Sequence, residues 1–214
     1  MPPPFRDRSD AGRRLADALA ARPGLAAPLV LALPRGGVPV AAEVARRLGA
    51  PLDVLVVRKL GVPGHEELAM GAIALGGIEY RDDPLIAACG VSGPAYTAVL
   101  RRERAELNRR ERLYRGSRPF APLAGRTVIV VDDGLATGAT MLAAVRALQR
   151  QQPGAIIVAT PVASPTALAR LGPEVDAIVA LLAPEDLGGI GEFYADFTQT
   201  SDETVRRLLP SAAP

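Results

Sequence analysis

The sequence predicts an α/β protein built on one doubly wound, mainly parallel sheet. Short apolar runs rich in Val and Ile alternate with stretches of helical periodicity. The apolar runs do not alternate apolar with polar residues, which is typical of strands covered on both faces. Strand followed by helix, repeated along the chain, predicts right-handed crossovers. The predicted strands are residues 29–33, 54–57, 127–131, 155–160 and 175–182.

Helical patterns separate these strands. Ser9 is a candidate cap for a first helix that ends near Pro23 and Gly24. A second helix is expected at residues 38–48, with Pro39 in its first turn. A third is expected at residues 140–152, because an apolar face there ends at a Pro-Gly pair.

Two further segments depart from this rhythm. Residues 94–115 form a predicted inserted helix with seven arginines against three glutamates. Such a helix either lies solvated on the core or on a second subunit, or presents a face to anions or nucleic acid. Residues 183–214 form a predicted small hood, in which Phe193 and Tyr194 either stack on a base or pack in the core. A short helix there has a candidate capping box from Thr200 to Glu203.

Composition restricts the classes of function. The 214 residues are 49% hydrophobic, so the chain is expected to form one domain with a core at about 29–182. A net charge of +2 does not favour a nucleic-acid partner. One cysteine and one histidine exclude an internal disulfide and a Cys/His metal centre. The chain shows neither an apolar leader nor a membrane-spanning run, so a cytoplasmic protein without a membrane partner is expected.

Residues 128–140 carry the strongest chemical signal. An apolar strand ends in Asp132 and Asp133, a turn rich in small residues follows, and a helix then begins. Ligands of open α/β sheets bind at the carboxyl ends of strands. Glycines let backbone amides approach an anion, and the first turn of a helix offers unpaired N–H donors. The predicted phosphate contacts are Gly134, Ala136, Thr137, Gly138, Ala139 and Thr140.

The two carboxylates point to a sugar phosphate. Alone they would repel a phosphate, but they accept hydrogen bonds from vicinal hydroxyls. They can also hold Mg²⁺, directly or through water. A phosphate close to a diol describes a ribose 5-phosphate. In the alternative interpretation, Asp132 and Asp133 only end a strand and Thr137 only caps a helix.

Residues 128–140 resemble the ribose-phosphate signature of type I phosphoribosyltransferases. Residues 31–38 (Leu-Ala-Leu-Pro-Arg-Gly-Gly-Val) resemble the pyrophosphate loop of that family. The resemblance implies that Arg35 and the amides of Gly36 and Gly37 bind pyrophosphate, in a loop that often holds a strained or cis peptide. A plain strand–helix turn is the alternative.

Residues 57–67 resemble the mobile catalytic loop of the same family. The resemblance implies that Arg58 and Lys59 contact pyrophosphate and that the glycines and proline after them form a flexible lid. Surface salt bridges are the alternative role for these two cations. The catalytic residues expected from the resemblance are Arg58, Lys59, Asp132 and Asp133, and the two aspartates are also the expected metal ligands.

The resemblance implies a function. Family members transfer a phosphoribosyl group from phosphoribosyl pyrophosphate to a nitrogenous acceptor with magnesium, release pyrophosphate, and are expected to be homodimers. Members that act on 6-oxopurines usually have an aspartate where this chain has Ala136, so a 6-oxopurine is not the expected acceptor. Two alternatives stay open: a regulator that senses nucleotides with the same fold, and an enzyme that hydrolyses or exchanges the same sugar phosphate.

Overall fold

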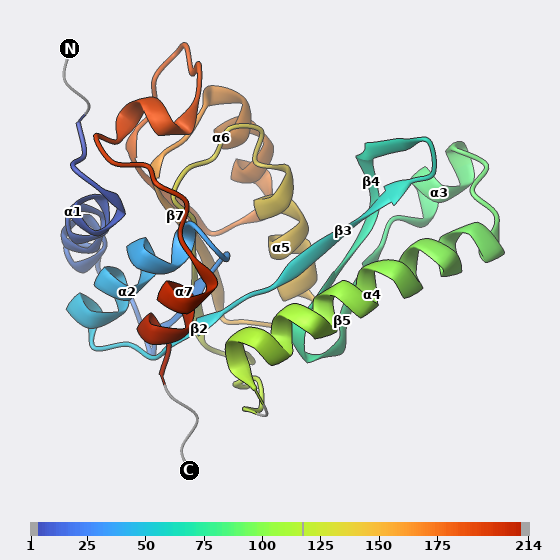
Figure 1. The fold of residues 1–214 in the computed structure, drawn as a ribbon, viewed down its shortest axis with the longest axis horizontal. Helices are drawn as coiled ribbons and strands as arrows, with labels where there is room; N and C mark the ends of the chain where they lie inside the picture. Colours follow the sequence, from blue (N-terminus) through green and yellow to red (C-terminus); the bar gives the residue numbers. More distant parts are fainter. Residues whose placement is uncertain (1–3, 117, 211–214) are drawn as a thin grey trace.

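The computed structural model describes residues 4–116 and 118–210, and it confirms the predicted fold class (Figure 1). A parallel five-stranded sheet has the order β2-β1-β6-β7-β8. Its strands are β1 (Leu29–Ala32), β2 (Leu52–Val54), β6 (Thr127–Val131), β7 (Ala155–Val162) and β8 (Ala177–Leu182). Four of them cover predicted strands to within two residues at each end. The exception is the predicted strand at 54–57, which falls at the junction of two separate strands.

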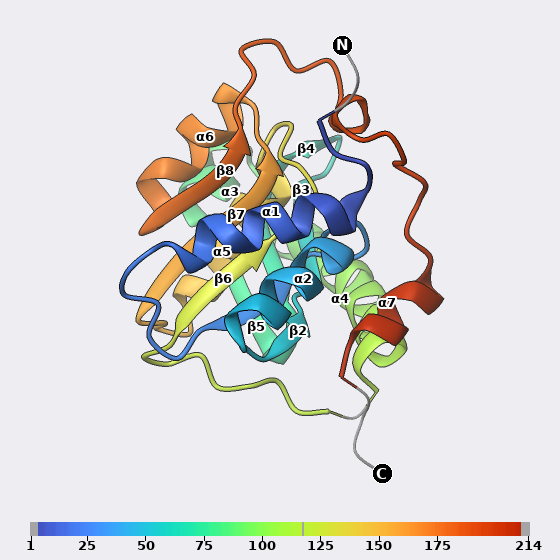
Figure 2. The same ribbon diagram turned by 90° about the vertical axis from the view of Figure 1, so that its left-hand side faces the viewer.

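Helices cover both faces of this sheet (Figure 2). Helices α1 (Arg8–Ala20) and α2 (Gly37–Leu48) pack on the face that carries Val30 and Ile129. Helices α5 (Ala139–Gln149) and α6 (Pro165–Leu171) pack on the face that carries Leu31 and Val130. Because every side chain of β1 and β6 is buried, neither strand shows an apolar–polar alternation.

The first helix begins earlier than the sequence suggested. Asp7, not Ser9, is the cap, and its carboxylate accepts a hydrogen bond from Asp10 N at 2.7 Å. An aspartate is as good a cap as a serine, so side-chain type alone did not separate the two candidates.

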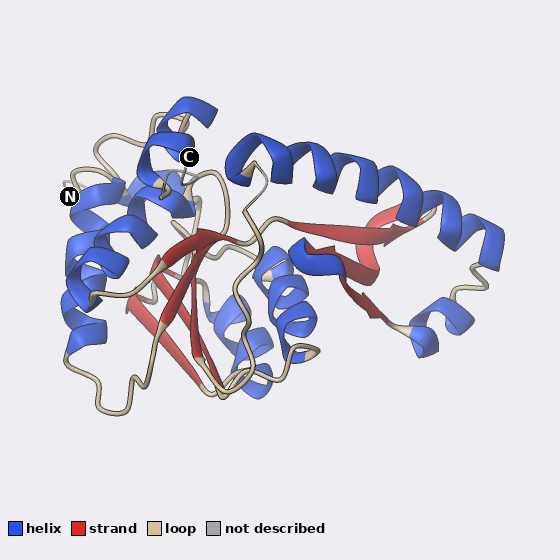
Figure 3. Ribbon diagram, turned by 90° about the horizontal axis from the view of Figure 1, so that it is seen from below, coloured by secondary structure: helices blue, strands red, loops and turns tan. Residues whose placement is uncertain are grey.

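A second, antiparallel sheet forms an arm beside the main sheet (Figure 3). Its strands run in the order β3 (Val57–Val62), β4 (His65–Ala74), β5 (Ile78–Arg81). The predicted lid at residues 57–67 is a β-hairpin that turns at Pro63 and Gly64, and its mobility stays a prediction. The segment forms paired strands because Leu60 and Val62 are buried in the same core as the apolar side chains of helix α4 (Gly93–Arg115). Helix α3 (Asp83–Ala88) follows at the end of the arm.

The predicted basic helix is α4 (Gly93–Arg115), and it lies along the arm. Tyr96, Val99 and Leu107 bury its apolar face against the core of the arm. Its arginines pair with acids of other elements as well as with its own glutamates: Arg104 bonds Glu79 at 2.8 Å. These contacts support the interpretation of a helix that lies on the body of the protein.

The C-terminal segment returns over the front of the sheet and ends in helix α7 (Asp202–Leu208). Its cap is Ser201, whose Oγ accepts from Thr204 N at 3.1 Å, so the predicted capping box at Thr200 is displaced by one residue. Earlier in the C-terminal segment, Phe193 O accepts a hydrogen bond from Phe5 N at 3.0 Å, which joins the N-terminal segment to the hood. Among the described helices, none combines the length and apolar character that crossing a bilayer requires.

One buried ion pair joins α4 to the main sheet and generates the first prediction. Arg115, with a side chain 1% exposed, donates to Asp53 on β2 at 2.8 Å. Asp53→Ala should lower the free energy of unfolding by about 3–5 kcal/mol in urea titrations, because the buried guanidinium then depends on its longer ion pair with Glu111, at 3.5 Å. Glu106→Ala removes an exposed pair of the same helix and should cost about 1 kcal/mol or less. Equal losses in the two variants would contradict this assignment.

Candidate functional site

The candidate site lies where the main sheet changes its winding direction. Strand β1 has β2 on one side and β6 on the other, so the connections that leave β1 and β6 diverge at their carboxyl ends. Ala32 pairs with Val131, and Leu33 N donates to Val131 O at 2.9 Å. The segments after the two strands therefore begin side by side, at the position where open α/β sheets bind ligands.

Two glycines allow these segments to touch. A Cβ on Gly37 would lie 2.6 Å from Val131 O, and a Cβ on Gly36 would overlap the carboxylate of Asp133. Gly37 N already donates to Leu33 O at 3.1 Å, so the prediction that this amide is exposed for pyrophosphate is wrong. Its glycine is required by close packing instead. The same loop contains a cis peptide bond between Pro34 and Arg35.

The loop after β6 is held through its carbonyl groups. Four of its carbonyl oxygens accept hydrogen bonds from surrounding protein. The bonds come from Tyr194 Oη to Asp133 O (2.6 Å), from Ser164 N to Leu135 O (2.9 Å), from Ser164 Oγ to Ala136 O and from Arg170 Nη1 to Thr137 O (2.6 Å). Burial and the charges of the two aspartates raise the pKa of Tyr194, which keeps its hydroxyl protonated as a donor. The loop is thus fixed from its carbonyl side.

The amides of the same loop are left for a ligand. Within the described part of the chain, no acceptor takes a hydrogen bond from the amides of Ala136, Thr137 or Gly138. Gly138 has a φ of 69°, a conformation that favours glycine, and helix α5 begins at the next residue. Three amides beside the positive end of a helix have the donors and the dipole that a phosphate group requires.

The acid pair stands between the two loops. Asp132 Oδ1 accepts a hydrogen bond from Asp133 N at 2.9 Å and lies close to Gly37. Burial, followed by the neighbouring charge of Asp133, raises the pKa of Asp132 well above its ordinary value. Asp133 forms an ion pair with Arg8, whose Nε lies 2.7 Å from Asp133 Oδ2. A divalent cation fits this donor set, because it would offset the repulsion between the carboxylates.

A cavity of about 460 Å³ opens in front of the acid pair. It brings together residues of the loop after β1, the loop after β6, helix α1 and the hood. The residues that line it are Arg8, Arg35, Gly36, Asp133, Phe197, Gln199 and Thr200. Arg35 and Asp133, predicted from distant segments of the sequence, thus face one space.

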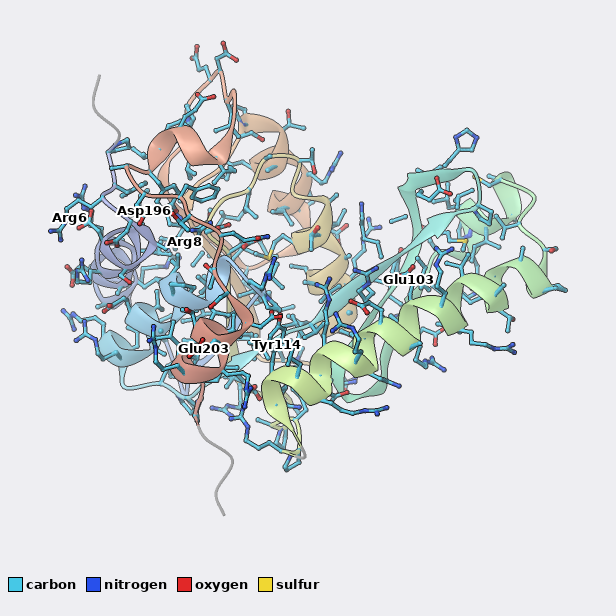
Figure 4. The ribbon with its side chains drawn as sticks, viewed as in Figure 1. Arg6, Arg8, Glu103, Tyr114, Asp196 and Glu203 are labelled. Carbon is cyan, nitrogen blue, oxygen red and sulfur yellow. The ribbon has the colours of Figure 1, made fainter. Side chains whose placement is uncertain are left out.

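The other two predicted cations lie apart from this cavity. Arg58 on β3 forms an ion pair with Glu103 of α4, with 2.6 Å between Arg58 Nη2 and Glu103 Oε2 (Figure 4). Lys59 is the next residue of the same strand, so its side chain points to the opposite face of the sheet. Neither residue is among the described ones that line the cavity, and their contact with pyrophosphate stays a prediction.

Sequence reasoning did not identify several side chains that build the site. Arg8 orients Asp133, while Ser164, Tyr194 and Arg170 hold the phosphate loop. Ser164 precedes a proline and caps α6, a signal that the sequence offered. Of the two aromatic residues proposed for base stacking, Tyr194 is buried and packs on Phe5 and Phe197, which agrees with core packing.

Comparisons with known proteins agree with this geometry. The profile of the family described as "Phosphoribosyl transferase domain" matches residues 9–171. A Mycobacterium tuberculosis protein named "Putative phosphoribosyl transferase Rv0571c" is 45% identical over 208 residues, which are 97% of this chain and 47% of that protein. The chain therefore spans about half the length of this relative.

Solved structures show the same fold. The crystal structure of the TT1426 protein from Thermus thermophilus has a TM-score of 0.88 and 46% identity, over 98% of either chain. The AQ2163 protein from Aquifex aeolicus has a TM-score of 0.51 and 15% identity, over 88% of this chain and 85% of that one. At that identity the second likeness concerns the fold alone.

The raised pKa of Asp132 predicts a pH-dependent stability. An acid whose folded pKa exceeds its unfolded value adds stability below about pH 4, and that stability is lost as pH rises through the folded pKa. Without ligands, Asp132→Asn should therefore melt above wild type near pH 8 and close to it near pH 4. Each change of 1 kcal/mol in the free energy of unfolding would shift the melting temperature by roughly 2–4 °C.

Asp133→Asn is the matched control, because it weakens the ion pair with Arg8 and should lower the melting temperature near pH 8. An Asp132→Asn variant that is destabilised near pH 8 would contradict the assignment of electrostatic strain to Asp132.

Proposed function

Because this chain belongs to the phosphoribosyl transferase domain family, we propose that it transfers a phosphoribosyl group from phosphoribosyl pyrophosphate to a nitrogenous acceptor and releases pyrophosphate. One observation carries the proposal: the three amides of Ala136–Gly138 without protein acceptors lie on the same short loop as the acid pair. A ribose 5-phosphate carries a phosphate and a diol on one small sugar.

Each part of the site would bind one part of the substrate. The amides of residues 136–138, with the hydroxyls of Thr137 and Thr140, would hold the 5-phosphate. Asp132 and Asp133 would accept hydrogen bonds from the ribose hydroxyls. Arg35 and the Gly36 amide, on the neighbouring loop, would meet the pyrophosphate. Arg35 lines the cavity and its side chain is 35% exposed, so it can reach an anion there.

The chemistry requires charge stabilisation more than acid–base catalysis. The bond from the anomeric carbon to pyrophosphate breaks, positive charge develops on the sugar, and a nitrogen of the acceptor forms the new bond. Fixed donors around the pyrophosphate stabilise the negative charge that leaves. A loop pinned through four carbonyl groups holds the sugar phosphate in one position while this occurs.

Magnesium fits the acid pair as the proposed cofactor. Magnesium sites in enzymes often combine one or two carboxylates with phosphate oxygens of the substrate, and Asp132 and Asp133 provide the carboxylates. The raised pKa of Asp132 supports this role, because a nearby cation would favour its ionised form. When bound, the ion would supply positive charge to the departing pyrophosphate.

Ala136 supports a choice of acceptor. Its methyl group is exposed at the point of the loop where a carboxylate would be needed to handle the proton of a 6-oxopurine. A methyl group neither accepts nor donates a proton. We therefore propose an acceptor other than hypoxanthine or guanine.

The second candidate function is a regulator that binds the same sugar phosphate without reaction. The ion pair between Arg58 and Glu103 favours it, because it engages a cation that an enzyme of this kind would direct to pyrophosphate. The two candidates differ in turnover and not in substrate binding.

Calorimetry with phosphoribosyl pyrophosphate and magnesium tests the binding site. Wild type should bind, and the double variant Asp132→Asn, Asp133→Asn should lose about a hundredfold or more in affinity, since each charge-assisted hydrogen bond contributes about 1.5–3 kcal/mol. Glu106→Gln, on the exposed part of α4, is the control and should bind as wild type does. Unaltered binding in the double variant would remove the acid pair from the site.

A screen of nitrogenous bases for pyrophosphate release tests the reaction. We expect release with at least one base and none with hypoxanthine or guanine, because Ala136 provides no proton acceptor. Turnover of a 6-oxopurine would overturn the choice of acceptor. If no base gives pyrophosphate release while substrate binding is retained, the result would favour the regulator.

A further inference from the structure

Arg8 reaches the candidate site from outside every segment that carries a family motif. It is the first residue of α1 (Figure 4). Its side chain is 11% exposed. Nε donates to Asp133 Oδ2 at 2.7 Å, and Nη1 donates to Thr198 O at 2.8 Å. Its guanidinium carbon lies 3.9 Å from the centre of the Phe197 ring, within the range of a cation–π contact. Three different partners thus fix one side chain.

Asp133 needs such a partner. Its carboxylate lies beside that of Asp132, which would repel it, and it occupies the space that Gly36 leaves open. Tyr194 holds the backbone carbonyl of Asp133 at 2.6 Å, but this bond does not orient the carboxylate. Among the described residues, Arg8 is the cation that pairs with Asp133, so it sets the direction of the carboxylate.

Asp133 can accept further hydrogen bonds besides the one from Arg8. An ionised carboxylate has about four acceptor positions on its two oxygens. Arg8 uses one of them on Oδ2. The remaining positions can accept hydrogen bonds from a ligand in the cavity that both residues line. Arg8 and a ribose hydroxyl can therefore bind Asp133 at the same time.

We propose that Arg8 is a positioning residue, which holds the Asp133 carboxylate in the orientation that accepts the ribose hydroxyls of a phosphoribosyl ligand. The inference rests on the proposed function. Because Arg8 also bonds Thr198 O and packs on Phe197, it connects the sugar site to the hood. The effect of Arg8 on binding passes through Asp133 and so concerns the ribose part of the ligand.

The test compares Arg8→Gln with Arg14→Gln. Arg14 is the matched control: it lies on the same helix, pairs with Asp10 at 2.9 Å and packs near the ring of Phe5, away from Asp133. Calorimetry with magnesium would measure three ligands: phosphoribosyl pyrophosphate, ribose 5-phosphate and inorganic pyrophosphate. Arg8→Gln should lower the affinity for the two ribose ligands by about tenfold to a hundredfold, as does the loss of a residue that orients a ligand-binding group. The affinity of Arg8→Gln for inorganic pyrophosphate should stay within about twofold of wild type. Arg14→Gln should bind all three ligands as wild type does.

A double-variant cycle adds a second readout. If Arg8 acts through Asp133, the combination of Arg8→Gln with Asp133→Asn should weaken binding no more than Asp133→Asn alone. Thermal melts would show whether Arg8→Gln is folded. If it is not, Arg8→Lys, which keeps the charge but not the planar fork, would carry the same comparison.

The outcomes separate the two proposals. If wild type binds phosphoribosyl pyrophosphate and Arg8→Gln binds it equally well or more tightly, the positioning role is wrong and the proposed function stands. Loss of pyrophosphate binding in Arg8→Gln would show direct contact with the leaving group and would also overturn it. Absence of phosphoribosyl pyrophosphate binding in wild type would overturn both.

Discussion

The close approach of the loops that follow β1 and β6 is the constraint on which the site depends. No side chain fits at Gly36 or Gly37, because Asp133 and the backbone of β6 occupy the space. Parallel pairing of the two strands sets this spacing, since Ala32 lies beside Val131 at the carboxyl edge of the sheet. If the two loops bind pyrophosphate and ribose phosphate as we propose, their close approach lets them hold two ends of one small molecule. The sheet pairing would then limit the size of the ligand.

The loop after β6, the proposed phosphate site, is held rigidly and contains no lysine. Its carbonyl oxygens are bonded by Ser164, Arg170 and Tyr194, which come from α6 and from the hood. A peptide group has its N–H opposite its C=O, so anchoring the carbonyls directs the amides to the other side. Donors fixed in this way need no reorganisation when a phosphate arrives. In the proposed function, the residues that bind the loop would contribute to ligand binding without touching the ligand.

The sequence revealed the parts of the site that neighbouring residues encode. The acids, small residues and threonines of residues 132–140 follow a uniformly apolar strand, so their position in the sequence placed them at a sheet edge. The alternation of predicted strands and helices along the chain predicted the fold class that the structure confirms. Arg8 and Asp133, in contrast, are 125 residues apart. The strand pairing within residues 57–67 was not predicted, because the Gly and Pro residues there indicated a flexible loop, whereas burial of Leu60 under α4 favours strands. In both cases the deciding partner lies on another element, which a local pattern does not encode.

The acid pair shows a conflict between stability and ligand binding. Burial of Asp132, together with its repulsion by the adjacent carboxylate of Asp133, raises the pKa of Asp132 and the free energy of the ligand-free protein. Arg8 relieves part of this repulsion through Asp133 and leaves Asp132 without a cation among its described hydrogen-bond partners. A bound diol or cation would relieve the remainder. Repulsion that persists in the free protein and falls on binding adds to affinity, so the same feature that weakens the fold favours the cation and the hydroxylated sugar that we propose.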